Sequence, residues 1–319
     1  MENQHINSIY IKAVRELYTD NIAYVKLGNN ISKEIKISKG LRQGCCIAPT
    51  LFKIYLGEAL KNWKIKCERM GIKLNDDMLY SLNFADDQVI FAENEYDAHY
   101  TLRKLNEEYE KWGLKINFKK TEYMVVGGTG KDLVMEDGSV VKCCQTYKYL
   151  GTILTDQGGS EEEIKHRIRQ GKSAIRQLHS IIWNKNIANK VKIRIYKTIV
   201  ESISLYGAEL WEISKNNEKK LKAMEMEFWR RSYCVTLMDR IRNENIKQQM
   251  GVTSDIMDTI EGRRLKWYGH LRRMPEERWP LKTWRWQVPM HRKRGRPKLT
   301  WYDGVRQTMR DRHIEDDDW

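Results

Sequence analysis

The stretch SLNFADDQVIF, from Ser81 to Phe91, places two adjacent carboxylates, Asp86 and Asp87, between two apolar runs. The pattern predicts a β-hairpin that rises over Met78–Ala85, turns at the two aspartates and descends over Gln88–Ala92. Neighbouring residues on a strand point to opposite faces, so these two side chains converge only if the backbone turns between them. The apolar flanks predict a buried stem that holds both carboxylates rigidly at the tip.

Composition and charge point to a folded protein with a polyanionic partner. The chain has 319 residues and is 41% hydrophobic, which favours more than one domain with a real core. Its 57 basic against 43 acidic residues leave a net charge of +14, which favours nucleic acid ahead of a membrane surface. Sixteen Lys or Arg but only four acids lie between residues 262 and 313. A merely solvated basic face explains this concentration less well than a segment that binds a polyanion.

The cysteines and the N-terminus indicate the compartment. Cys45–Cys46 and Cys143–Cys144 are adjacent pairs, and no Cys/His set has zinc spacing, so we expect thiols and no zinc site. The N-terminus has no secretory apolar core, and no apolar run approaches membrane-spanning length. We therefore expect an intracellular protein, nuclear or cytoplasmic, without a membrane partner.

The first half of the chain predicts mixed structure. Residues 3–19 read as a helix, and β-like runs at 22–27 and 33–38 flank a turn at Gly28-Asn29-Asn30. A glycine-containing loop at 39–50 and an apolar helix at about 51–70 precede the hairpin. The clearest helix follows it, with apolar residues at spacings of 4, 3, 4 and 3: Ala98, Leu102, Leu105, Tyr109 and Trp112.

The second half changes from strands to helices. Short strands are predicted at 122–126, 133–135, 140–141 and 147–154, and helices at 160–183, 188–205 and 215–233. Residues 261–274 read as a basic helix, after which prolines predict a partly irregular extension. The order predicts an α+β domain joined to a helical one, with a boundary near residue 157.

The paired carboxylates suggest metal-assisted phosphoryl transfer. Oxygen-only ligands suit Mg²⁺, which keeps several waters and shares its shell with substrate phosphates. In two-metal transfer the ions stabilise the attacking and leaving oxygens, and two acids on one turn rarely hold two ions. A third carboxylate from elsewhere is therefore expected. The alternative is that Asp-Asp is an ordinary turn, where aspartate is common.

Four blocks together resemble the reverse transcriptases, those of non-LTR retrotransposons in particular. F-A-D-D at Phe84–Asp87 resembles their central catalytic motif. The other blocks occur in the family's order over about residues 6–210: GLRQGCCIAPTLFKIYL (Gly40–Leu56), GLKINFKKTEYM (Gly113–Met124) and YKYLGTIL (Tyr147–Leu154). Their joint spacing makes the resemblance far more specific than any one motif.

The resemblance implies an α+β fold and a polymerase activity. The expected parts are a partial palm at 1–157, with an antiparallel sheet and helices on one face, a helical thumb or connection at 158–235, and a basic helical or irregular tail at 236–319. The implied activity is RNA-directed DNA synthesis, with an RNA template, a DNA primer or target DNA, dNTPs and two Mg²⁺ ions.

The resemblance also implies roles for single residues. Asp86 and Asp87 would bind metal, Lys120 would act as a general acid, and Leu150 with Gly151 would grip the primer. Five residues would contact template or nucleotide: Arg42, Gln43, Gly44, Phe84 and Ala85. Purely structural alternatives stay open for three glycines and the lysine: an ordinary loop for Gly40 and Gly44, a bulge at Gly151, and a solvated side chain for Lys120.

One part of the family pattern is missing. The family's first metal-binding aspartate lies on a strand well upstream of the R-Q-G loop, and Asp20, the only aspartate before Gly40, matches a variable loop position. The fingers are also absent, so we expect the C-terminal part of a longer polymerase, weak or inactive by itself. The alternatives are a non-catalytic nucleic-acid-binding remnant and, less favoured, a structural fragment without a present role.

The basic C-terminal region carries two further blocks. RRLKWYGHLRRM (Arg263–Met274) and HRKRGRPKLTWYDGV (His291–Val305) are similar to blocks in tails of some non-LTR element proteins. The second block contains R-G-R-P, which resembles the core of an AT-hook, and narrow A·T minor grooves of DNA attract arginine. The simpler alternative is a basic loop that makes general phosphate contacts. The residues expected to bind DNA or RNA are Arg292, Lys293, Arg294, Arg296 and Lys298. Tryptophans such as Trp284 and Trp301 could stack on bases but are more often core, and His270 is expected to pack or touch phosphate.

Overall fold

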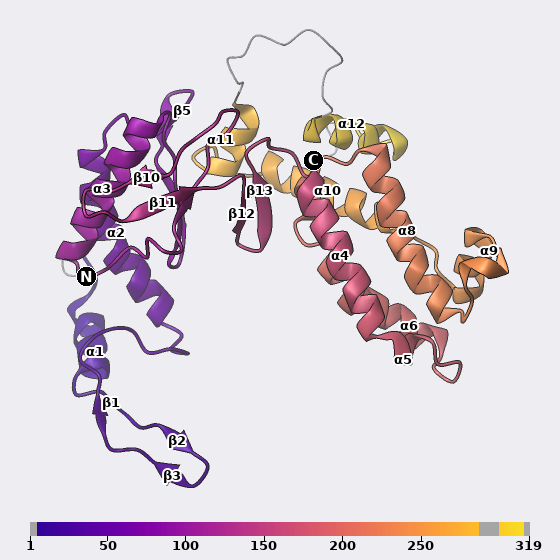
Figure 1. Cartoon of the computed structure of the whole chain (residues 1–319), viewed down its shortest axis with the longest axis horizontal. Helices are drawn as coiled ribbons and strands as arrows, with labels where there is room; N and C mark the ends of the chain where they lie inside the picture. The colour runs from indigo at the N-terminus through magenta and orange to yellow at the C-terminus, as the bar shows by residue number, and fades with distance from the viewer. Residues whose placement is uncertain (1–4, 287–299, 316–319) are drawn as a thin grey trace. The chain divides into compact units, whose positions relative to one another are not determined.

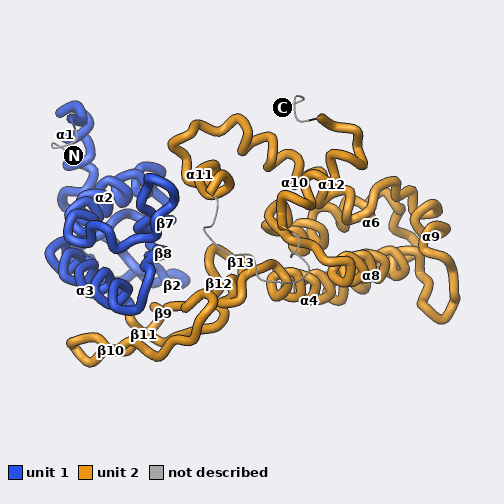
Figure 2. The backbone as a smooth tube through the Cα atoms, turned by 90° about the horizontal axis from the view of Figure 1, so that it is seen from above, with its two compact units in different colours: residues 1–117 blue, residues 118–319 orange. Residues whose placement is uncertain are grey.

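The computed structural model describes residues 5–286 and 300–315 (Figure 1). The chain folds into two compact units, residues 1–117 and 118–319, coloured blue and orange in Figure 2. Both combine helices with short strands, so the predicted α+β class is confirmed. Strands β9–β13 belong to the second unit together with the helices that follow them. The division between palm and thumb near residue 157 stays a prediction.

The first unit contains three helices and eight strands among its described residues. In chain order they are α1 (Ser8–Tyr18), β1 (Ile22–Ala23), β2 (Lys26–Leu27), β3 (Asn30–Ile31), β4 (Ile35–Lys36), α2 (Ala48–Lys66), β5 (Ile72–Leu74), β6 (Asp77–Leu79), β7 (Ser81–Phe84), β8 (Asp87–Ile90) and α3 (Glu95–Lys111). The strands pair antiparallel as β1–β4, β2–β3, β5–β6 and β7–β8. Each of these described sheets has two strands.

The core of the first unit lies between α2 and α3. Trp63 of α2 is fully buried, and its Nε1 donates to the backbone carbonyl oxygen of Thr101 on α3 at 2.9 Å. Leu105 and Tyr109 complete the apolar face that the spacing of α3 predicted. Gly113 follows the C-cap of α3 with a φ of +67°, a left-handed conformation that favours glycine just after a helix.

The N-terminal segment differs from its prediction in detail. The helix begins at Ser8 rather than at residue 3, because the Asn7 side chain caps it by accepting from the backbone N–H of Ile9. The hairpin turn contains only Gly28 and Asn29, since Asn30 already pairs with Leu27. The turn was therefore predicted in the right place but one residue too long.

The second unit begins with strands and continues with helices. Its strands are β9 (Glu122–Tyr123), β10 (Leu133–Val134), β11 (Val140–Cys143), β12 (Thr146–Tyr149) and β13 (Thr152–Thr155). The helical elements are α4 (Glu161–Gln177), α5 (His179–Ile182), α6 (Asn189–Ile195), a π-helix (Tyr196–Glu201), α7 (Ser202–Ser204), η3 (Ala208–Leu210), α8 (Lys215–Ser232), η4 (Leu237–Asp239), α9 (Asn243–Met250), α10 (Ile256–Arg272), α11 (Trp279–Arg285) and α12 (Trp301–Asp311). β11 pairs antiparallel with β10 and parallel with β9, while β12 and β13 form a hairpin.

The helices that follow residue 235 are packed, not irregular. Arg264 of α10 is buried, and its Nη2 donates to the backbone carbonyl oxygen of Trp211 at 3.1 Å. Gly304 of α12 leaves the space that this guanidinium fills, and the Nε1 of Trp301 donates to the carbonyl oxygen of Glu209 at 2.7 Å. The described part of the expected extension is therefore folded helix with its own apolar cluster. Trp284 and Trp301 pack against this cluster beside the buried Tyr268, so the core interpretation of these tryptophans is confirmed.

A buried acid in α8 leads to a prediction about pH. Glu225 is 1% exposed, and burial raises the pKa of its carboxyl although Lys247, at 3.1 Å, partly offsets the rise. A carboxyl with a raised pKa in the folded state adds stability below its unfolded pKa and loses it as the pH rises through the folded pKa. Glu225→Gln should therefore gain stability relative to the wild type as the pH rises from about 4 to about 7. Urea denaturation across this range measures the difference in the free energy of unfolding between the variant and the wild type. A difference that does not change with pH would contradict the prediction.

Candidate functional site

The carboxylate hairpin is formed by β7 and β8, with a turn of two residues. Phe84 pairs with Asp87, so the turn consists of Ala85 and Asp86, and Ala85 adopts a φ of +53°. The prediction that both aspartates form the tip was therefore wrong by one residue: Asp87 begins the descending strand. The rising strand is also shorter than predicted, because Met78 belongs to β6, which pairs with β5.

The two faces of this hairpin have different surroundings. The hydroxyl of Tyr109 on α3 donates to Oε1 of Gln88 at 2.6 Å, and Ile90 packs against the α2–α3 core. Burial raises the pKa of Tyr109 to about 12, so this hydroxyl remains a donor at neutral pH. Because side chains alternate along a strand, Asp87 lies on the opposite face, away from α3. Its cross-strand partner Phe84 shares that face.

The expected burial of the stem is not observed. Leu82 is 39% and Phe84 is 64% exposed, and both aspartates are exposed. Among the described residues no further strand pairs with β7 or β8, and the side chains on the outer face of the hairpin are exposed. The carboxylates are therefore solvated, need no cationic partner for stability, and are open to water, metal or phosphate.

A second hairpin of the same geometry shows how little the local pattern specifies. β5 and β6 are joined by Asn75 and Asp76, with Leu74 paired to Asp77. Asn75 has a φ of +56°, close to that of Ala85. Two turns ten residues apart thus end in Asp-Asp, so the turn alone does not identify a catalytic site.

The donor set of the β7–β8 turn fits a hard cation held in part by water. Mg²⁺ is commonly bound through one or two carboxylates, with waters and substrate phosphates in the remaining positions. Asp86 and Asp87 offer such oxygens and no competing soft ligand. Within residues 5–286 and 300–315, no group of three or more His, Cys, Asp or Glu side chains is placed to hold a metal ion.

The R-Q-G loop is anchored to α1 and the start of β1. The Arg42 guanidinium donates to Oδ1 of Asn21 and lies over the ring of Tyr18 at 6.0 Å. Gly44 has a φ of +85° with open space where a Cβ would be, so the backbone conformation rather than crowding requires glycine. Arg42 is thus engaged within the unit, while the side chain of Gln43 is exposed.

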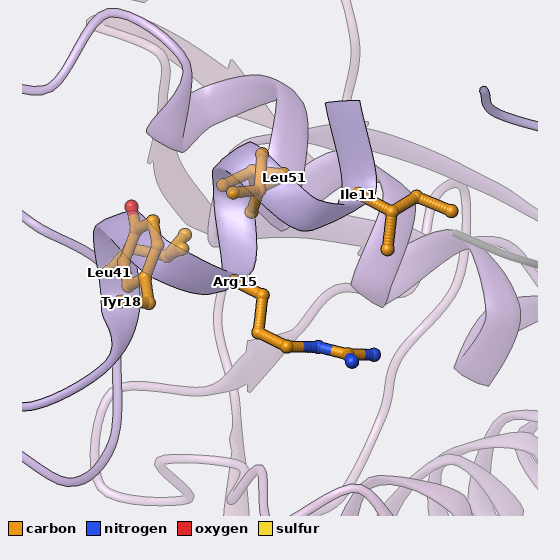
Figure 3. A pocket seen from close by; sticks show the side chains of 6 residues that line it. Ile11, Arg15, Tyr18, Leu41 and Leu51 are labelled. Carbon is orange, nitrogen blue, oxygen red and sulfur yellow. The ribbon is translucent and has the colours of Figure 1, made fainter. Parts of the chain in front are cut away.

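An open apolar hollow of about 340 Å³ lies beside this loop. Figure 3 shows side chains of α1, of the loop and of the start of α2 around it. Its lining is almost entirely apolar, with one cation from α1: Ile11, Val14, Arg15, Tyr18, Leu41 and Leu51. Tyr18 and Leu41 both line it, so α1 and the loop meet at this hollow.

The remaining predicted residues lie in the second unit or outside the described structure. Lys120 is exposed in a turn just before β9. Leu150 and Gly151 form the two-residue turn between β12 and β13, with φ of +47° and +86°, so Gly151 occupies a hairpin turn rather than a bulge. The predicted DNA- or RNA-binding residues 292–298 lie outside the described residues.

Three residues at the β12–β13 turn were missed by the sequence analysis. Arg167, Glu163 and Tyr206 all contact this turn or its strands. Glu163 and Arg167 are spaced i, i+4 and directly precede the apolar residues Ile164 and Ile168, which is a signal of an ion pair on the buried side of a helix. Tyr206 has no comparable signal, because it meets the turn only through the tertiary fold.

A comparison with known protein families gives a match that covers the first unit and continues to the β12–β13 hairpin. Residues 2–154 match the family described as reverse transcriptase (RNA-dependent DNA polymerase). The chain is also 24% identical, over 264 residues, to a transposon-derived protein of Caenorhabditis elegans, covering 76% of this chain and 90% of that protein. The part of the chain aligned with that protein is longer than the family match at residues 2–154. This likeness therefore extends into the helices of the second unit. No helix in the described parts is long and apolar enough to cross a membrane.

Proposed function

From the reverse transcriptase region at residues 2–154, we propose that the chain is a retroelement RNA-directed DNA polymerase of the non-LTR type. It would join dNTPs to a DNA primer or target DNA on an RNA template. The observation that carries the proposal is the β7–β8 turn, which presents two exposed carboxylates inside the matching region. The β5–β6 turn has the same shape, so the family match is what distinguishes the two.

Asp86 and Asp87 are the proposed metal ligands. Mg²⁺ bound there would supply charge that stabilises the attacking and leaving oxygens of nucleotidyl transfer. The chain's own contribution is to hold the carboxylates in place: the Tyr109–Gln88 hydrogen bond fixes β8 against α3, and the turn at Ala85 sets the direction of Asp86. Exposure of both side chains leaves room for the phosphates that complete the metal shell.

The other motif residues have narrower proposed roles. Gln43 can donate to and accept from a base or sugar edge, and Gly44 lets the backbone approach a bulky nucleotide pair. Phe84 and Ala85 would border the nucleotide, while Arg42 would keep the loop in position through Asn21. Lys120 would protonate the pyrophosphate leaving group. Leu150 and Gly151 would touch the primer.

Primer extension on an RNA template with Mg²⁺ tests the proposal. We expect weak extension or none from this chain, because only two carboxylates are gathered at the turn and a two-metal site uses more. Any extension should disappear in Asp86→Asn and persist in Asp76→Asn, which makes the same change at the matching position of the β5–β6 turn. Synthesis that survives Asp86→Asn would contradict the assignment of the site. Robust synthesis lost in Asp86→Asn would show instead that a third carboxylate is not needed.

The second candidate function is a non-catalytic nucleic-acid-binding remnant. The observation in its favour is the same count of two carboxylates at the turn. Binding of a primer–template without extension at any Mg²⁺ concentration, and with equal affinity for wild type and Asp86→Asn, would support this function over polymerisation.

A further inference from the structure

The turn between β12 and β13 is held by side chains from outside the hairpin. The hydroxyl of Tyr206 donates to the carbonyl oxygen of Leu150 at 3.0 Å. Nη2 of Arg167 donates to the carbonyl oxygen of Gly151 at 2.5 Å. Both carbonyl groups of the turn are therefore bound, and the non-glycine residue at positive φ is kept in an otherwise unfavourable conformation.

The cation in this clamp is neutralised inside the protein. Arg167 is 7% exposed, and its Nε donates to Oε1 of Glu163 at 2.5 Å. The other oxygen of Glu163 accepts from the backbone N–H of Ile153 on β13 at 2.8 Å, which ties the strand to α4. Arg167 is therefore committed to the fold and is not a free phosphate-binding group.

Tyr206 differs from its partners because half of it remains open. The Arg167 guanidinium lies 4.7 Å from the centre of the Tyr206 ring, and the hydroxyl is bound to the turn, yet the residue is 49% exposed. Leu150, next to it, is 38% exposed. The result is a flat aromatic ring, fixed at its hydroxyl and supported by a cation, beside an exposed leucine.

We infer that Tyr206 is a stacking platform for the last nucleotide of a primer strand, with Arg167 and Glu163 as positioning residues. This inference rests on the proposed function, in which the Leu150–Gly151 turn touches the primer. A ring whose orientation is already set loses little freedom when a base stacks on it, and stacking on tyrosine tolerates any base. A polymerase must accept all four bases at the primer end, so such a contact suits this position.

A fluorescent base at the primer end tests the inference without requiring catalysis. The probe is a DNA primer with 2-aminopurine as its 3′ nucleotide, annealed to an RNA template, and stacking lowers its fluorescence. Wild type should quench the probe and bind it more tightly than a blunt duplex of equal length. Tyr206→Ala should abolish the quenching and weaken primer–template binding about tenfold, with blunt-duplex binding unchanged.

Two further variants separate stacking from folding. Tyr206→Phe keeps the ring but removes the hydrogen bond to Leu150, so quenching should persist while primer–template affinity falls a few-fold. Tyr233→Ala, at another exposed tyrosine of the second unit, should behave as wild type. If Tyr206→Ala quenches the probe as strongly as wild type, the inference about Tyr206 is overturned, while the proposed primer role of the turn is unaffected. A wild type that neither quenches the probe nor prefers it to the blunt duplex would overturn the proposed primer role of the turn itself.

Discussion

Glu163→Ala is expected to destabilise the second unit by about 3–5 kcal/mol, because it leaves a buried arginine without its counter-ion. The side chains of Glu163 and Arg167 are 2% and 8% exposed, so water cannot replace the lost carboxylate. The variant also removes the acceptor of the Ile153 backbone N–H. Urea denaturation followed by tryptophan fluorescence measures the loss, and hydrogen exchange at Ile153 should show an amide that opens more readily.

An exposed ion pair in the same unit provides the control. Glu218 and Lys222 are also spaced i, i+4, at 2.7 Å, but their side chains are 39% and 43% exposed. Glu218→Ala should therefore cost less than about 1 kcal/mol. The double variant Glu163→Met with Arg167→Met removes both charges and should be less harmful than Glu163→Ala. Equal losses for Glu163→Ala and Glu218→Ala would contradict the view that burial decides the effect.

Replacing the basic segment is expected to change how nucleic-acid binding depends on salt. Each phosphate contact adds about 0.9 to the slope of log K against log salt on duplex DNA. The variant replaces five residues by alanine: Arg292, Lys293, Arg294, Arg296 and Lys298. The slope should fall by up to about 4, which reduces the loss of affinity between about 50 and 200 mM salt by a factor of about 10²–10³. Fluorescence anisotropy with a labelled duplex over this salt range measures the affinity at each salt concentration and hence the slope.

A charge-matched variant distinguishes the segment from the overall charge. Five exposed lysines of the second unit serve for this purpose: Lys185, Lys190, Lys215, Lys219 and Lys220. Their replacement by alanine changes the net charge equally and should alter the slope much less. An unchanged slope in the first variant would remove the segment's proposed role, and equal changes in both would assign binding to net charge alone.

Much of the fold follows from local patterns in the sequence. The spacing of apolar residues predicted α3 within a few residues, and glycine with polar neighbours marked the turn at Gly28. The R-Q-G and F-A-D-D blocks, taken in order, also predicted the region that matches the reverse transcriptase family. These features depend on residues close together in the chain, which is why periodicity and turn chemistry report them.

The register and the exposure of the carboxylate hairpin were harder to predict. Alternating apolar residues at Leu82, Phe84 and Val89 suggest a buried face, and Asp-Asp suggests a symmetrical tip. The actual register begins β8 at Asp87, and the face with Leu82 and Phe84 remains open, since both side chains are exposed. Local alternation indicates which residues share a face but not whether anything covers it.

By itself the sequence determined the α+β class, the main helices, the concentration of positive charge and the region that matches the reverse transcriptase family, because each depends on residues close together in the chain. Only the tertiary structure decided that Gln88 faces α3 while Asp87 faces away, and that α10 and α12 pack against each other. It also brought Tyr206 to Leu150, which lies 56 residues earlier in the chain. Such contacts depend on how whole elements bury their apolar faces against one another, and no short stretch of sequence contains that information.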